Sequence, residues 1–144
     1  MSKVYALSGL RVGYVVAHRD TVRTLAPWTP PWAVSLPAQL AAIEALADPA
    51  YYQQKYSETH ALREALSADL ATIPGVQVYP STTNAVLLEI KCSAERAADH
   101  MRRAGVFIRN CDSMSDHFHD RFIRIAVKPA FHNCRVAAAL RAAI

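Results

Sequence analysis

The feature that most constrains the fold is a long helical pattern that stops abruptly at Pro74-Gly75. It begins near Ala50 and runs toward Thr72. In its second half, apolar side chains recur at helical spacing, at Leu62, Leu66, Leu70 and Ile73, while charged side chains occupy the other faces. We therefore expect one face of this helix to pack in a core or an interface. Proline followed by glycine favours a turn, so the helix should end there.

Beyond Gly75 the hydrophobic period changes from that of a helix to that of strands. Short apolar runs predict strands over residues 76–79, 84–90, 106–110 and 122–127. Ser93 is a typical N-cap for a helix that ends before Gly105, and a closing helix is predicted over 133–144. Strands that alternate with helices after a long helix indicate a compact α/β unit.

The helix that precedes the long one has clear boundaries in the sequence. Ser35 is a good N-cap, and Asp48-Pro49 should end the helix. Leu36, Leu40 and Ile43 recur between these limits at helical spacing. A hinge within residues 48–54 would divide the chain into two units.

Residues 18–32 predict a short helix and a connector. Asp20 or Thr21 is expected to cap a helix over 22–25. The prolines of the segment 27–32 favour an extended backbone, because proline removes a hydrogen-bond donor and restricts the residue before it. Trp28 and Trp32 of this connector are expected to pack on the core.

Composition excludes several classes of protein. Apolar residues make up 52% of the chain and charged residues 19%, which is typical of a globular domain and not of a disordered one. There is no apolar run of about eighteen residues and no secretory leader pattern, so no membrane span is expected. The net charge is +4, but the arginines are scattered and have no interleaved aromatic residues, which disfavours nucleic-acid binding. The three cysteines have no metal-site spacing and suggest free thiols in the cytoplasm.

The first seventeen residues hold two cations among small residues and one apolar run. Lys3 and Arg11 are eight residues apart, and Val12–Ala17 predicts a buried strand directly after the arginine. A positive charge close to a buried strand needs an anionic or covalent partner, because an unpaired buried charge is costly. A lysine can act as a nucleophile when it is deprotonated, and a guanidinium matches phosphate with two parallel hydrogen bonds.

Ser2-Lys3 followed by Gly9-Leu10-Arg11-Val12-Gly13-Tyr14 resembles the lysine signature of the fold-type-I pyridoxal-phosphate enzymes, specifically the class I/II aminotransferases. The resemblance implies pyridoxal 5'-phosphate as the cofactor. It implies that Lys3 is the catalytic lysine, which forms the internal Schiff base with the cofactor aldehyde and later moves a proton. It also implies that Ser2 and Arg11 bind the cofactor phosphate.

A second candidate site lies near the carboxyl end. Arg124 is the lone charge of the apolar strand 122–127, and a buried arginine there would need a carboxylate or phosphate partner. The segment Arg124-Ile125-Ala126-Val127 resembles the family strand whose arginine binds the α-carboxylate of the amino-acid substrate. The alternative is a structural ion pair with Asp112, Asp116 or Asp120.

Two weaker candidates follow from the same region. Arg109-Asn110 resembles a family position near the substrate mouth. His117 and His119 would face the same way in an extended chain and invite a metal hypothesis, but no third ligand has suitable spacing, so a solvated loop is favoured and no metal site is predicted.

The resemblance extends along essentially the whole chain and is greatest to the branch that contains histidinol-phosphate aminotransferase and threonine-phosphate decarboxylase. Family members are more than twice this long, and the aspartate that pairs with the pyridinium nitrogen lies upstream of the segment that this chain matches. The resemblance therefore implies the C-terminal portion of a fold-type-I enzyme. Residues 1–49 would be the tail of the large domain, with the lysine segment, and residues 50–144 the small α/β domain, which a long helix links to it.

The function implied is transamination between an amino acid and a 2-oxo acid, in a homodimer. Alone, the chain would have weak activity or none, as expected for a truncated gene product or a fragment of a longer one. Two alternatives remain open: a decarboxylase of an amino-acid phosphate with the same cofactor, and a non-catalytic remnant that acts as an interaction module.

Overall fold

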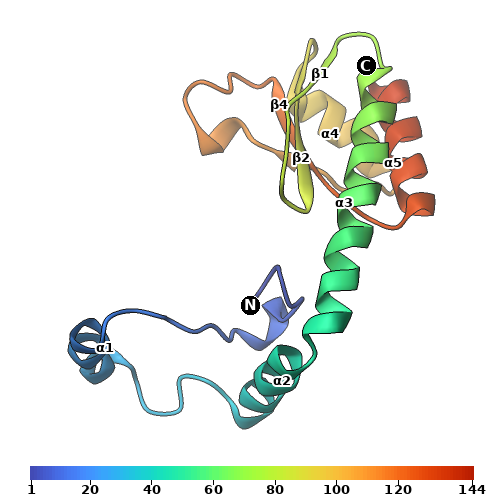
Figure 1. Cartoon of the computed structure of the whole chain (residues 1–144). Coiled ribbons are helices and arrows are strands. Elements are labelled where there is room, and N and C mark those ends of the chain that lie inside the picture. The colour runs from blue at the N-terminus through green and yellow to red at the C-terminus, as the bar shows by residue number, and fades with distance from the viewer. The chain divides into compact units, whose positions relative to one another are not determined.

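The computed structural model describes residues 1–144 and divides them into two compact units, Met1–Lys55 and Tyr56–Ile144. The long helix α3, Pro49–Ala71, begins in the first unit and continues into the second (Figure 1). Asp48 starts it, since a carboxylate oxygen of Asp48 accepts the backbone N–H of Tyr51 at 3.0 Å. The predicted helix over 50–72 is thus confirmed within one residue at each end.

The second unit is an antiparallel sheet with helices on one face. The strands are β1 Val76–Val78, β2 Ala85–Ile90, β3 Arg109–Asn110 and β4 Phe122–Ala126, in the order β1-β2-β4-β3. The helices are the second part of α3, α4 Ala94–Arg103 and α5 Ala130–Ala143. The predicted strand 106–110 shortens to two residues, and the closing helix begins three residues before Asn133.

The core of this unit lies between the helices and the inner face of the sheet. It combines side chains from α3, β2, α4, β4 and α5, among them Leu70, Leu88, Met101, Ile123 and Leu140, each fully buried. Alternate residues of a strand point to opposite faces, so every second residue of β2 and β4 lies in the core. The intervening residues, including Leu87 and Arg124, lie on the outer face.

The first unit has two α-helices and two 3-10 turns before α3. These are α1 Arg19–Leu25, the 3-10 turn η2 Ala26–Trp28 and α2 Leu36–Ala47; a further 3-10 turn, η1, spans Ser8–Leu10. The expected cap Ser35 accepts the N–H of Ala38 at 3.4 Å. The cap of α1 differs from the prediction: the ring of His18, not Asp20 or Thr21, accepts the N–H of Asp20 at 3.4 Å.

Two expectations for this unit are wrong. Val12–Ala17 is not a strand: only Val12 is buried, and residues 13–17 are exposed without a neighbouring strand to satisfy their backbone groups. Trp28 and Trp32 do not pack on the core and are 83% and 96% exposed. On α2 the residues Leu36, Leu40 and Ile43, called the leucine stripe below, are exposed. The small side chains of Ala38, Ala42 and Ala45 are buried.

Candidate functional site

The first eleven residues form a loop of consecutive turns. The backbone N–H groups of Tyr5 and Leu7 both donate to the carbonyl of Met1, at 3.1 and 3.5 Å. The N–H of Ala6 donates to the carbonyl of Lys3 at 3.3 Å. Lys3 therefore lies within a hydrogen-bonded turn, and its side chain is exposed.

Both ends of this loop are anchored on the same helix. Met1, Leu7 and Val12 pack in one cluster with Ala38 and Ala42 of α2. Ser2 directly follows the first of these anchors and Arg11 directly precedes the last. The small alanine side chains of α2 allow the loop to approach the helix closely, and the backbones of Ser2 and Arg11 are thereby held at one cluster.

The Arg11 side chain keeps most of its hydrogen-bonding capacity. Its backbone adopts the left-handed region, with φ at 52°, and its Nη1 donates to the carbonyl of Ser8 at 3.0 Å. A guanidinium has five N–H donors, so most of them remain available to a ligand. Beside it, a Cβ added to Gly9 or Gly13 would meet no atom within 4 Å, which leaves open space along the loop. The charges predicted to lie near a buried strand are thus both at the surface.

The donor set of this loop fits the cofactor that the sequence implies. Pyridoxal phosphate needs phosphate ligands and an amine that can bond to its carbonyl carbon. Ser2 offers a hydroxyl, Arg11 a guanidinium and Lys3 a primary amine, all within one anchored loop. A fixed fork of N–H donors suits phosphate oxygens. The carboxylate that would pair with the pyridinium nitrogen is not among these donors.

Arg124 belongs to the second unit and lies at the middle of β4 on the outer face of the sheet. It pairs with Leu87 of β2 on one side and with Arg109 of β3 on the other. The prediction that Arg124 is buried is wrong, because its side chain is on the face that no helix of this unit covers. The charge itself is available: no ion pair involves Arg124.

The alternative partners of Arg124 are occupied elsewhere or remain apart from it. Asp112 accepts the backbone N–H of Asp120 at 2.8 Å. Asp120 in turn accepts the N–H of Glu95 at 2.9 Å, which places its carboxylate at the start of α4. Asp116 is exposed and forms no ion pair. The structural ion pair considered for Arg124 is therefore absent.

The register of the sheet brings Arg109 beside Arg124. From the sequence alone, Arg109 is only a weak candidate. The two guanidiniums share the outer face of neighbouring strands, and Arg109 also has no acidic partner. Both charges act on the buried thiol of Cys111. Burial raises the pKa of this thiol, and the charges of Arg124 and then Arg109 oppose that rise. The sequence carried the signal, an arginine in each of two predicted strands, but not their pairing.

The loop that holds His117 and His119, called the histidine loop below, offers no metal centre. No group of three His, Cys, Asp or Glu side chains in the 144 residues is arranged to hold a metal ion. No helix of the chain combines the length and the apolar character that crossing a membrane requires.

Comparison of the sequence with known families and proteins gives consistent matches. A profile of the family described as aminotransferase class I and II matches residues 1–142. A histidinol-phosphate aminotransferase of Methanosarcina mazei is 32% identical over 139 residues, which cover 96% of this chain and 36% of that protein. The corresponding enzyme of Methanocaldococcus jannaschii is 31% identical over 127 residues, which cover 88% of this chain and 34% of that protein. The chain thus spans about a third of the length of these curated relatives.

Solved structures resemble the fold as well. The histidinol-phosphate aminotransferase of Clostridium acetobutylicum matches 99% of this chain and 43% of its own, at a TM-score of 0.87 and 26% identity. The histidinol-phosphate aminotransferase of Sinorhizobium meliloti, solved in complex with pyridoxal-5'-phosphate, matches 99% of this chain and 39% of its own, at a TM-score of 0.79 and 29% identity. The L-threonine-O-3-phosphate decarboxylase of Porphyromonas gingivalis matches 98% of this chain and 44% of its own, at a TM-score of 0.79 and 28% identity.

Proposed function

Because this chain belongs to the aminotransferase class I and II family, we propose that it serves pyridoxal-phosphate-dependent amino transfer between an amino acid and a 2-oxo acid. Its α/β fold is that of the C-terminal portion of a fold-type-I enzyme, as predicted. The observation that carries the proposal is the donor set of the anchored loop, with Ser2, Lys3 and Arg11 in the order of the family signature.

In this proposal each candidate residue has its own role. Ser2 Oγ and the free N–H groups of Arg11 hold the phosphate of the cofactor, which fixes its position against the loop. Lys3 Nζ is the amine that would hold the cofactor at its carbonyl carbon, with loss of water, and as a free amine it would accept a proton from the substrate Cα. Bound pyridoxal phosphate supplies a conjugated ring that draws electrons away from that carbon. Arg124 binds the α-carboxylate of the substrate and thereby orients the substrate.

The position of the two candidate sites in the chain supports a domain assignment. We propose that residues 1–49 are the tail of a large cofactor-binding domain and residues 50–144 a small domain. The division of the structure after Lys55 falls a few residues from that boundary. Since the chain spans about a third of its relatives, the isolated chain should bind cofactor more readily than it turns over substrate.

Reduction with borohydride tests the cofactor role directly. After incubation with pyridoxal phosphate and reduction, peptide mass mapping should find the cofactor adduct on Lys3. Lys3→Ala should abolish this adduct, and Lys91→Ala, which removes another exposed lysine, should leave it intact. Arg11→Gln should weaken cofactor binding at least tenfold, because a charge-assisted phosphate contact is lost. An adduct spread evenly over the lysines, or none on Lys3, would refute the proposal.

A second candidate function is decarboxylation of an amino-acid phosphate with the same cofactor. The likeness to the Porphyromonas gingivalis decarboxylase favours it, as does the pair of arginines on one sheet face, which suits a substrate with two acidic groups. Release of carbon dioxide from threonine phosphate would support this function, whereas amino transfer that depends on a 2-oxo acid would support the first. A chain that shows neither activity, and no adduct on Lys3, would favour the third alternative, a non-catalytic remnant that acts as an interaction module.

We also propose that the chain works in the cytoplasm as part of a homodimer. The three cysteines, Cys92, Cys111 and Cys134, are all free thiols, which suits a reducing compartment. Light scattering on the purified chain would measure the dimer directly, and a mass of one chain at all concentrations would contradict it.

A further inference from the structure

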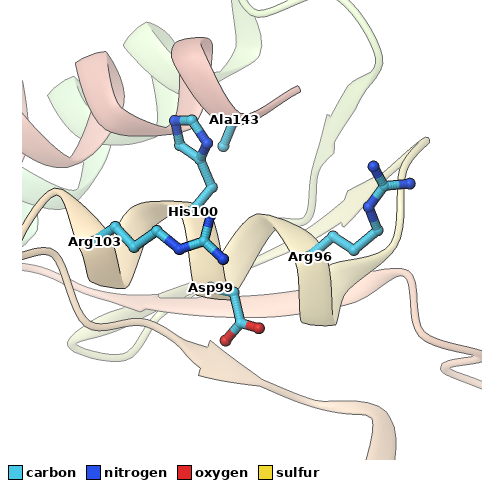
Figure 2. A pocket seen from close by; sticks show the side chains of 5 residues that line it. All are labelled: Arg96, Asp99, His100, Arg103 and Ala143. Atoms are coloured by element: carbon cyan, nitrogen blue, oxygen red, sulfur yellow. The ribbon is translucent and has the colours of Figure 1, made fainter.

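A hollow of about 340 Å³ lies beside α4 and the end of α5, within the second unit and outside the residues discussed above. Four of its five lining residues are polar or charged. Arg96, Asp99, His100 and Arg103 come from α4, and Ala143 comes from the last turn of α5 (Figure 2). Figure 2 shows the His100 ring directed toward Ala143, with Arg96 and Arg103 attached at opposite ends of this stretch of α4.

The positive charge of this hollow is not neutralised. Arg96, His100 and Arg103 are separated by four and three residues, so they lie along one side of α4. None of them forms an ion pair. The single acidic residue of the lining, Asp99, is already bonded to Arg102, which does not line the hollow. Two guanidiniums and one imidazole therefore line the hollow, and the one carboxylate beside them, that of Asp99, is paired with a residue outside the lining.

Helix ends alone do not account for this cluster. The C-terminal end of a helix carries a partial charge of about −0.5, and both α4 and α5 end near the hollow. Arg103 in the last turn of α4 suits that role. Arg96 does not, because it lies in the first turn of α4, where the helix end is positive and a cation is disfavoured. Arg96 thus adds charge that the helices do not require.

We propose that this hollow binds a small anion with at least two phosphate groups. A guanidinium fork matches phosphate oxygens, and the volume lies within the range of about 300–1,000 Å³ typical of small-molecule sites. Arg96 and Arg103 are about 10 Å apart along the helix axis, which favours a bridging diphosphate or triphosphate over a single phosphate. The lining has no Phe, Tyr or Trp side chain, and its two guanidiniums are the groups that recognise the phosphates.

Calorimetric titration of the chain with inorganic pyrophosphate at physiological salt tests the proposal, with orthophosphate as the comparison. Pyrophosphate should bind at least tenfold more tightly than orthophosphate. Arg96→Gln and Arg103→Gln should each weaken pyrophosphate binding about tenfold, since each removes a charge-assisted contact. Arg121→Gln removes the same charge from an exposed site on the same unit and should have no effect.

The test separates this hollow from the proposed cofactor site. Arg11→Gln should weaken pyridoxal-phosphate binding and leave pyrophosphate binding in the hollow unchanged. Equal affinities for the two phosphates, or an Arg96→Gln effect no larger than that of Arg121→Gln, would overturn the proposal. Circular dichroism of each variant would confirm that α4 remains folded.

Discussion

Arg109 of β3 lies directly opposite Arg124 of β4 in the antiparallel ladder, and neither guanidinium has a carboxylate partner. Like charges at directly opposed positions destabilise a sheet. The arrangement therefore carries a cost in the unliganded chain. An anionic group bound at both arginines would remove the repulsion, which agrees with the proposal that Arg124 binds a substrate carboxylate.

Removal of one charge of this pair should stabilise the second unit. We expect Arg109→Gln to raise the free energy of unfolding by about 0.5 kcal/mol, because the cross-strand repulsion is relieved at an exposed position. Urea denaturation at low salt would measure the change, and high salt should shrink it. Arg121→Gln, which has no opposed arginine, is the matched control. A loss of stability in Arg109→Gln would mean that the pair is held by contacts other than charge.

Acid should destabilise the junction between the histidine loop and α4. The Ser93 hydroxyl, then the N–H groups of Glu95 and Ala94, hold the pKa of Asp120 below its ordinary 3.8. This carboxylate therefore contributes stability that is present above pH 3.8 and is lost as the pH falls through its lower folded pKa. Asp120→Asn should flatten this part of the pH dependence of unfolding. A pH profile identical to that of the unmodified chain would contradict the assignment.

Side chains alternate between the two faces of β2, so two neighbouring leucines should differ in their contribution to the free energy of unfolding. Leu88 is fully buried in the core, whereas Leu87 lies half-buried on the outer face. Leu88→Ala should cost about 2–5 kcal/mol, because it removes buried surface and leaves a cavity. Leu87→Ala should cost less than about 1 kcal/mol. Thermal or urea unfolding would compare the two, and equal losses would place the core elsewhere.

The phenol of Tyr79 should report on its neighbour Glu89. Tyr79 Oη donates to the Glu89 carboxylate at 3.0 Å, and this bond is the main cause that raises the pKa of Tyr79 above 10.0. Glu89→Gln should therefore lower the midpoint of the phenol titration, followed by absorbance near the tyrosinate band. Because the folded pKa of Tyr79 is raised, the bond contributes fully below the ordinary pKa of 10.0 and is lost as the pH rises through the higher folded pKa. An unchanged midpoint would show that the bond does not persist in solution.

Local sequence signals predicted the element types of this chain well. Ser35 and Ser93 both cap the helices they were expected to cap, and Pro74-Gly75 follows the end of α3. These features depend on hydrogen bonds and backbone preferences within a few residues, which the sequence states directly. The order of Ser2, Lys3 and Arg11 likewise indicated the family without any knowledge of the fold.

The tertiary structure decided which predicted features meet. The leucine stripe of α2 has helical spacing, yet the alanine face is buried, because the loop packs close to the helix where small side chains allow it. The register of β3 on β4 brings Arg109 beside Arg124, and no local pattern encodes that pairing. A sequence fixes the period of each element through its own backbone. The choice of face and register depends on contacts between residues far apart in the chain, so only the folded structure specifies it.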